Sequence, residues 1–136
     1  MSIVIDASVA LKWVFDEPGT DAALALRGQQ LIAPVLWLAE AANALWRHAR
    51  LGEITVEQAH ARMSELATAP VGSLAMEPHI PRALELATEI GHPVYDCVYL
   101  ALALQHGSYV VSDDRRFAAA AARHPDLADR VRLLGS

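Results

Sequence analysis

Short apolar runs alternate with longer helix-forming segments along the whole chain, and this alternation is the strongest constraint on the fold. Five runs rich in Val, Ile and Leu have the length of strands. The segments between them carry helix formers, with Pro or Gly at several of their ends. Strands separated by helical crossovers predict an α/β fold, a three-layer α/β/α sandwich with a mainly parallel sheet of about five strands. The predicted strands are residues 2–6, 31–33, 73–76, 109–111 and 131–134, and the predicted helices are residues 7–15, 21–27, 35–51, 56–69, 81–90, 94–106 and 115–123.

Size and composition predict one globular domain over residues 1–136, because 54% of the residues are hydrophobic and only 20% are charged. The single cysteine, Cys97, excludes an intrachain disulfide and a multi-cysteine zinc site, and it fits a reducing compartment. The longest apolar run, residues 97–104, is too short to cross a bilayer, and Asp6 interrupts any stretch resembling a secretory signal. We therefore expect a cytoplasmic protein without a membrane span. The net charge of −5 is unlike that of proteins that coat nucleic acids.

Acidic side chains follow two of the predicted strands at the points where those strands end. Asp6 comes after the run Ile3-Val4-Ile5, and Ser112, Asp113 and Asp114 come after the fourth run. Ligands of open α/β sheets bind outside the carboxyl ends of the strands, which predicts a site at this edge. Each acid could instead cap the helix that follows it, which contributes about 1 kcal/mol.

Two further acids lie on predicted helices. Asp96 opens a helix whose next eight residues are all apolar, so it could serve the helix dipole, but a carboxylate leading into so buried a segment is costly without a partner. Glu40 lies in mid-helix, where no cap is needed. With Asn43 and Arg47 it forms a row beside the expected core stripe, and such a row could also be ordinary solvated surface.

If the sheet forms as predicted, Asp6, Glu40, Asp96 and Asp114 meet in one hollow. Two carboxylates about 5 Å apart repel each other by roughly 3 kcal/mol at an effective dielectric constant of about 20. A cation offsets this repulsion, and oxygen ligands without Cys or paired His favour Mg²⁺ or Mn²⁺ over zinc. Such an ion can polarise a phosphoryl oxygen and activate water. The sequence therefore favours metal-dependent phosphate chemistry.

Four segments carry a family resemblance: Ile3-Val4-Ile5-Asp6-Ala7-Ser8, Ala39-Glu40-Ala41-Ala42-Asn43-Ala44-Leu45, Pro93-Val94-Tyr95-Asp96 and Val111-Ser112-Asp113-Asp114-Arg115-Arg116-Phe117. With these segments in this order, the chain resembles PIN-domain ribonucleases of the VapC toxin type, from Ser2 to about Arg123. The resemblance implies that Asp6, Glu40, Asp96 and Asp114 are catalytic acids that bind Mg²⁺, for which Mn²⁺ can substitute. It further implies that Ser8, Asn43 and Ser112 support these ligands. The family has a small residue where this chain has Asp113, so Asp113 could share or replace the role of Asp114.

The same resemblance implies a Mg²⁺-dependent endoribonuclease that cleaves single-stranded RNA and acts as the toxin of a toxin–antitoxin pair. Its expected partners are a VapB-type antitoxin and a second copy of the chain in a homodimer. Four arginines, Arg47, Arg50, Arg115 and Arg116, are expected to flank the acids and bind RNA phosphates, although each could be ordinary surface charge. No pair of the six histidines has zinc-ligand spacing, so all six are expected to be structural or on the surface.

A second hypothesis is a non-catalytic PIN-fold binding module that acts through its apolar surface, with the acids serving only as caps. It depends on the tryptophans of the third predicted helix. Helical spacing assigns Val35, Leu38, Leu45 and Trp46 to the core stripe, and it leaves Trp37 projecting toward the surface. With Trp13 and Phe15 near in the chain, Trp37 would then contribute to an apolar patch, unless another helix covers it.

Overall fold

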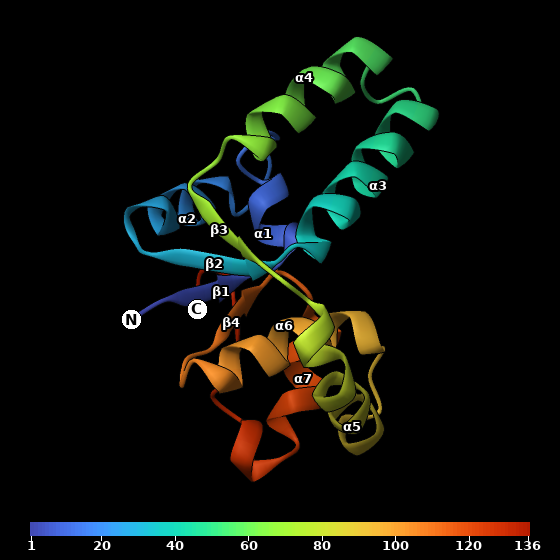
Figure 1. The fold of residues 1–136 in the computed structure, drawn as a ribbon. Helices are drawn as coiled ribbons and strands as arrows, with labels where there is room; N and C mark the ends of the chain where they lie inside the picture. The colour runs from blue at the N-terminus through green and yellow to red at the C-terminus, as the bar shows by residue number, and fades with distance from the viewer.

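Five parallel strands form the sheet of the computed structural model, which describes all residues 1–136. The strand order is β3-β2-β1-β4-β5, so β1 and β4 are neighbours at its centre, with Ile5 opposite Val111. The predicted three-layer α/β/α sandwich is confirmed (Figure 1). The strands are β1 (Ile3–Ile5), β2 (Leu31–Pro34), β3 (Val71–Leu74), β4 (Val110–Ser112) and β5 (Val131–Leu133), and the helices are α1 (Ala7–Leu11), α2 (Thr20–Ala25), α3 (Leu36–Arg50), α4 (Val56–Ala67), α5 (Ile80–Ile90), α6 (Val94–Gln105) and α7 (Arg115–Ala122).

The helices form two layers. In Figure 1, α1 to α4 lie on one side of the sheet and α5 to α7 on the other. Helix α6 packs against β1, β2 and β4, and all seven of its residues from Cys97 to Ala103 are buried, as its continuous apolar run predicts. None of the helices combines the length and the apolar character that a membrane span requires. Helix α6 thus covers the centre of the sheet on its second face.

The third strand begins two residues earlier than predicted, at Val71 rather than at residue 73. Strand β3 is an edge strand that pairs only with β2, and its two middle residues, Gly72 and Ser73, are exposed. A strand with one solvated edge and little apolar alternation gives a weak sequence pattern, which explains the displaced boundary.

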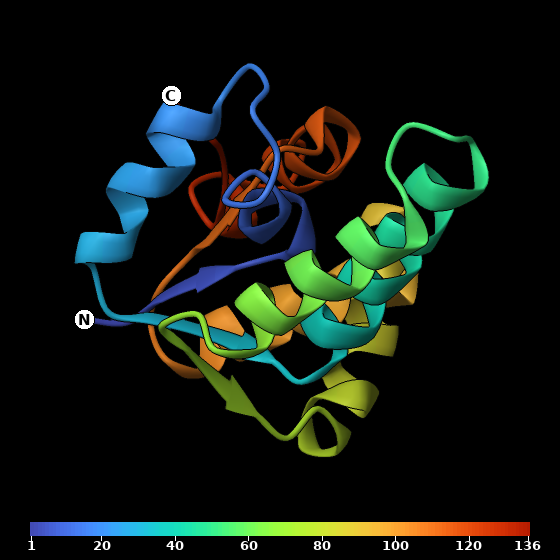
Figure 2. The same cartoon turned by 90° about the horizontal axis from the view of Figure 1, so that it is seen from above.

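The expected positions of the two tryptophans of α3 are wrong. Trp37 is only 2% exposed, and its Nε1 donates to the Ser73 hydroxyl at 2.9 Å, whereas Trp46 is 55% exposed and Val35 is 43% exposed. Of the row assigned to the core, Leu45 is buried and Leu38 packs against the core, as predicted. Trp46 lies instead in the lining of a groove between α3 and α4. Helices α3 and α4 form a pair that projects from the body (Figure 1 and Figure 2), so the space between them stays open as an apolar groove of about 280 Å³.

Candidate functional site

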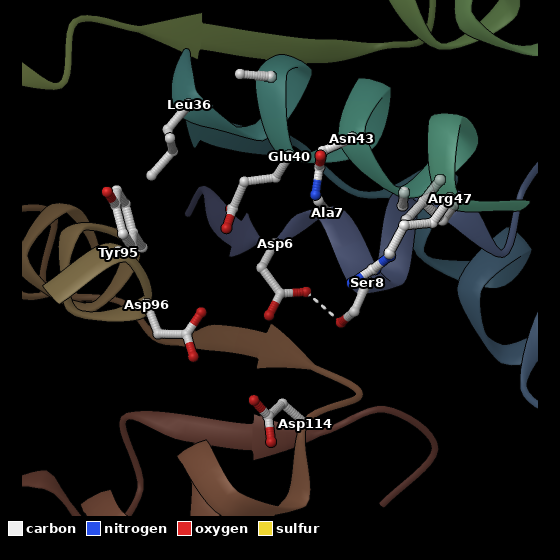
Figure 3. Close-up of a pocket in the computed structure, with 13 residues that line it drawn as sticks. Asp6, Ala7, Ser8, Leu36, Glu40, Asn43, Arg47, Tyr95, Asp96 and Asp114 are labelled. Atoms are coloured by element: carbon white, nitrogen blue, oxygen red, sulfur yellow. Dashed lines mark hydrogen bonds between the residues drawn. The ribbon is translucent and has the colours of Figure 1, made fainter. Parts of the chain in front are cut away.

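One hollow of about 510 Å³ lies at the carboxyl ends of β1 and β4. It is lined by all four acids that the sequence singled out: Asp6, Glu40, Asp96 and Asp114. Figure 3 shows Asp6 at its centre, Glu40 reaching down from α3, and Asp96 and Asp114 on the side away from α3. The chain moves outward in one direction from β1 to β2 and β3, and in the other direction from β4 to β5. The hollow therefore lies at the point where the strand order reverses, which is where open α/β sheets bind ligands.

Asp6 is both a helix cap and a member of the acidic hollow. Its Oδ1 accepts a hydrogen bond from the Val9 backbone N–H at 3.3 Å, which caps α1, and its side chain also lines the hollow. The residue is only 5% exposed and no cation pairs with it. Burial, with a smaller contribution from the charge of Asp96, raises the pKa of the Asp6 carboxyl to about 7, although its hydrogen bonds act in the opposite direction.

Two serines join the ends of β1 and β4 beneath Asp6. The Ser8 hydroxyl donates to Asp6 Oδ1 at 2.5 Å and accepts from the Asp113 backbone N–H at 2.9 Å. The Ser112 hydroxyl accepts from the Asp114 backbone N–H at 3.0 Å, and its interaction with the Asp6 carboxyl lowers the pKa of that group. These bonds hold the Asp6 side chain and the loop after β4 in a fixed relation.

The structure separates the two neighbouring acids after β4. Asp114 lines the hollow, and its Oδ1 caps α7 by accepting from the backbone N–H groups of Arg116 at 2.9 Å and Phe117 at 3.3 Å. Asp113 points elsewhere, because its Oδ2 lies 3.3 Å from Lys12 Nζ in an ion pair. Of the two, only Asp114 presents its carboxylate to the other acids.

Glu40 is connected to α6 by a hydrogen bond that sequence analysis missed. The Tyr99 hydroxyl donates to Glu40 Oε1 at 2.5 Å, and Tyr99 itself is fully buried. Burial raises the pKa of Glu40, the Tyr99 bond opposes that change, and the charge of Asp96 adds to it. A usable signal was present, because Tyr99 is three residues after Asp96 and so shares its helix face.

His92 is a second residue that sequence analysis did not place at the site. Its Nε2 lies 2.6 Å from Asp96 Oδ2, and its ring stacks on the buried Phe117 at a centroid distance of 5.0 Å. One ligand atom each from His92, Asp96 and Asp114 lies within 4.8 Å of the other two. His92 therefore holds Asp96 in position or offers a nitrogen ligand itself.

The four expected RNA-binding arginines occupy different places. Arg47 lines the acidic hollow, and Arg116 lines a second hollow that shares Asp96 and Asp114 with it. Arg50 lies over the exposed Trp46 ring at 5.5 Å, and Arg115 lines a separate hollow between α7 and β5. Asn43, expected to support the ligands, lines the acidic hollow (Figure 3).

The donor set fits a hard divalent cation. Four carboxylates converge and none of them pairs with a lysine or an arginine, although Arg47 lines the same hollow. The most central carboxyl, that of Asp6, is buried and its pKa is raised. An unpaired buried carboxylate is costly, so the arrangement is stabilised by a bound positive charge. Carboxylate oxygens are the ligands that Mg²⁺ and Mn²⁺ prefer.

Comparisons with known proteins agree on one family. Residues 3–123 match the family model described as PIN domain. The chain is 35% identical over 124 residues to a protein named Ribonuclease VapC3 from Pyrobaculum aerophilum, a match that covers 87% of this chain and 93% of that protein. Among solved structures, the crystal structure of PAE2754 from Pyrobaculum aerophilum superposes with a TM-score of 0.75 at 25% identity, covering 98% of this chain and 84% of that one.

Proposed function

The chain belongs to the PIN-domain family as a member of the VapC type, and from this premise we propose that it is a Mg²⁺-dependent endoribonuclease that cleaves single-stranded RNA as the toxin of a toxin–antitoxin pair. The observation that carries the proposal is the buried, cation-free Asp6 carboxylate at the centre of three further acids. Because RNA and its phosphodiester bonds are negatively charged, such a cluster repels the substrate unless a metal ion intervenes.

Asp6, Asp96 and Asp114 hold the metal in this proposal, and Glu40 holds metal or orients the attacking water. A bound divalent ion supplies the polarisation of the scissile phosphoryl group and the activation of water. The serines on either side of Asp6 fix its carboxylate, and Tyr99 fixes Glu40 from the buried helix α6. Arg47 lies at the rim of the hollow, where its guanidinium can bind a substrate phosphate in bidentate fashion.

Cleavage assays with the purified chain test this function. We expect a single-stranded RNA to be cut in Mg²⁺ or Mn²⁺, to leave a 5′-phosphate and a 3′-hydroxyl, and to stay intact in EDTA. Asp6→Asn is expected to lower the rate at least about 100-fold while keeping the cap of α1, since the amide oxygen still accepts the Val9 N–H. Activity that survives either chelation or this substitution rules the proposal out.

The VapC type implies a partner of the VapB antitoxin type, and we propose that the protein acts in the cytoplasm as a homodimer held inactive by such an antitoxin. Co-expression with the product of a neighbouring small gene, followed by size-exclusion chromatography with light scattering, measures both associations. A chain that stays monomeric and binds no such product contradicts this part of the proposal.

One observation favours the rival function of a non-catalytic module. The groove between α3 and α4 is apolar and open, and Trp46 and Val56 in its lining are 55% and 60% exposed. Metal titration separates the two functions, because a ligand at 100 times its Kd stabilises a fold by about 2.7 kcal/mol. An unfolding temperature that does not change with Mn²⁺ would favour the binding module.

A further inference from the structure

A second hollow of about 540 Å³ adjoins the acidic one and shares two of its walls, Asp96 and Asp114. It lies between α7 and the turn that joins α5 to α6. Its other walls carry Arg116, Arg123 and His92, together with small or apolar residues of α7 and of the turn. A hollow that carries two arginines therefore adjoins the acidic centre at Asp96 and Asp114. These two acids lie on the side away from α3 (Figure 3).

The guanidinium groups of Arg116 and Arg123 have no partner in the protein. Neither forms an ion pair with any acid, including the two acids of their own hollow. Several other arginines are engaged: Arg82 pairs with Glu85, Arg130 donates to the Ser108 carbonyl, and Arg132 lies over the Tyr109 ring. Arg47 and Arg115 also lack a partner, but Arg116 and Arg123 are the two that line one hollow together. Two unengaged guanidinium groups facing one hollow leave their hydrogen-bond donors free for an anion from outside.

The α7 surface between the two arginines is built from small residues. Ala119 and Ala120 line the hollow, so no long side chain blocks the path from one arginine to the other. Arg123 is seven residues after Arg116, which places it about 10 Å further along the helix axis and on nearly the same face. This spacing produces an extended cationic track that leads away from the acids.

We propose that this hollow is a phosphate-binding subsite, in which Arg116 and Arg123 hold the backbone of the RNA strand on one side of the cleaved bond. The inference rests on the proposed nuclease function and extends it to the path of the substrate. Arg47 lies on the opposite side of the acids, so the strand passes from Arg47 across the metal centre to the α7 track. The subsite binds phosphates that flank the reacting one and makes no sequence-specific contact with the bases.

Truncated substrates test this path. After the wild-type cleavage site has been mapped on a longer RNA, two oligonucleotides are made, one shortened on the 5′ side of that site and one shortened on the 3′ side. Arg123→Ala is expected to raise KM about fivefold to tenfold, with kcat within twofold, on the one oligonucleotide that retains the flank over α7. On the other oligonucleotide KM stays unchanged. The slope of log KM against log salt concentration falls by about 0.7 on the retained flank, as expected for the loss of one phosphate contact.

Two variants complete the design. Arg123→Lys keeps the charge but loses bidentate geometry, so it is expected to recover part of the KM loss. Arg82→Ala removes an equal charge from the exposed surface of α5 and is expected to change neither oligonucleotide's KM. An equal rise of KM on both oligonucleotides, no rise on either, or a change confined to kcat would overturn the subsite.

The failure of the nuclease function is distinguishable from the failure of the subsite. If the wild-type chain cuts no RNA, binding of a fluorescein-labelled single-stranded RNA is measured by anisotropy in the Asp6→Asn background. A fivefold weaker Kd on adding Arg123→Ala, with no change on adding Arg82→Ala, supports the subsite independently of cleavage. Equal affinities in all three proteins refute it.

Discussion

Replacing Asp6 by Asn is expected to stabilise the metal-free protein, by an amount that grows with pH. The Asp6 carboxyl is buried without a cationic partner, and its pKa is raised from 3.8 to about 7. Between these two values the folded state keeps the proton while the unfolded state releases it. The free energy of unfolding of the wild type is therefore not reduced by Asp6 below about pH 4, and it falls as pH rises from there toward 7. An ion-paired carboxylate shows the opposite dependence on pH.

The magnitude follows from the same two pKa values. At about 1.4 kcal/mol per pH unit, the difference between 3.8 and about 7 corresponds to roughly 4 kcal/mol at neutral pH. The amide of Asn carries no charge, and its oxygen can still accept the hydrogen bonds from Ser8 and Val9. Above pH 7 the difference between the two proteins is expected to reach a plateau.

Urea unfolding in EDTA from pH 4 to pH 8 measures this difference, since the remaining titrating groups are common to both proteins and cancel. Asp16→Asn, which changes an exposed carboxylate, is the matched control and is expected to shift stability by less than about 0.5 kcal/mol at every pH. Parallel curves for the wild type and Asp6→Asn would refute the claim that Asp6 is buried at an energetic cost. Adding Mn²⁺ at pH 8 should then stabilise the wild type and leave Asp6→Asn nearly unchanged.

Three further outcomes are expected. Asp114→Asn lowers RNA cleavage at least about 100-fold, whereas Asp113→Asn changes it by no more than a few fold, because Asp113 pairs with Lys12 outside the hollow; equal losses in kcat would contradict this division. Trp37→Ala is expected to lower the free energy of unfolding, measured in urea, by about 3–5 kcal/mol, and Trp46→Ala by less than about 1 kcal/mol, since only the Trp37 indole is buried. A larger loss for Trp46→Ala would instead support the sequence-based assignment of Trp46 to the core. Lys12→Met is expected to lower the free energy of unfolding by about 2 kcal/mol, because it leaves Glu17 and Asp113 without their cation. The loss is smaller than for a fully buried pair, since these two acids are about half exposed. An unchanged unfolding temperature would show that these ion pairs do not stabilise the fold.

The sequence predicted those features of the site that depend on where strands end. Asp6 and Asp114 follow β1 and β4, and adjacent parallel strands bring their carboxyl ends to one place whatever the details of packing. The order of strands and helices also follows from alternation alone, because a parallel sheet needs long crossovers. The convergence of distant acids was thus a consequence of topology.

Features that depend on side-chain packing could not be obtained in this way. Trp37 and Trp46 lie on two rows of α3 that are similarly apolar, and only the projection of the α3–α4 pair decides which row is covered. The choice between Asp113 and Asp114 depends on the Ser8 hydroxyl, which accepts the Asp113 N–H and fixes the turn after β4. The bond between His92 and Asp96 depends in turn on how α5 ends at Gly91, whose φ of +66° lets the chain reverse into α6.

The distribution of cations explains how the acidic hollow stays available to a metal. The only lysine, Lys12, is occupied by Glu17 and Asp113, so it neutralises the one acid after β4 that lies outside the hollow. Arg47 lines the acidic hollow and Arg116 lines the hollow beside it, and neither pairs with any acid. An arginine in contact with Asp6 would stabilise the metal-free fold but would occupy the carboxylate oxygens that a divalent ion needs. A cation of the protein at this site would therefore stabilise the metal-free fold and at the same time compete with the metal. The raised pKa of Asp6 reflects the cost of leaving its buried carboxylate without such a partner.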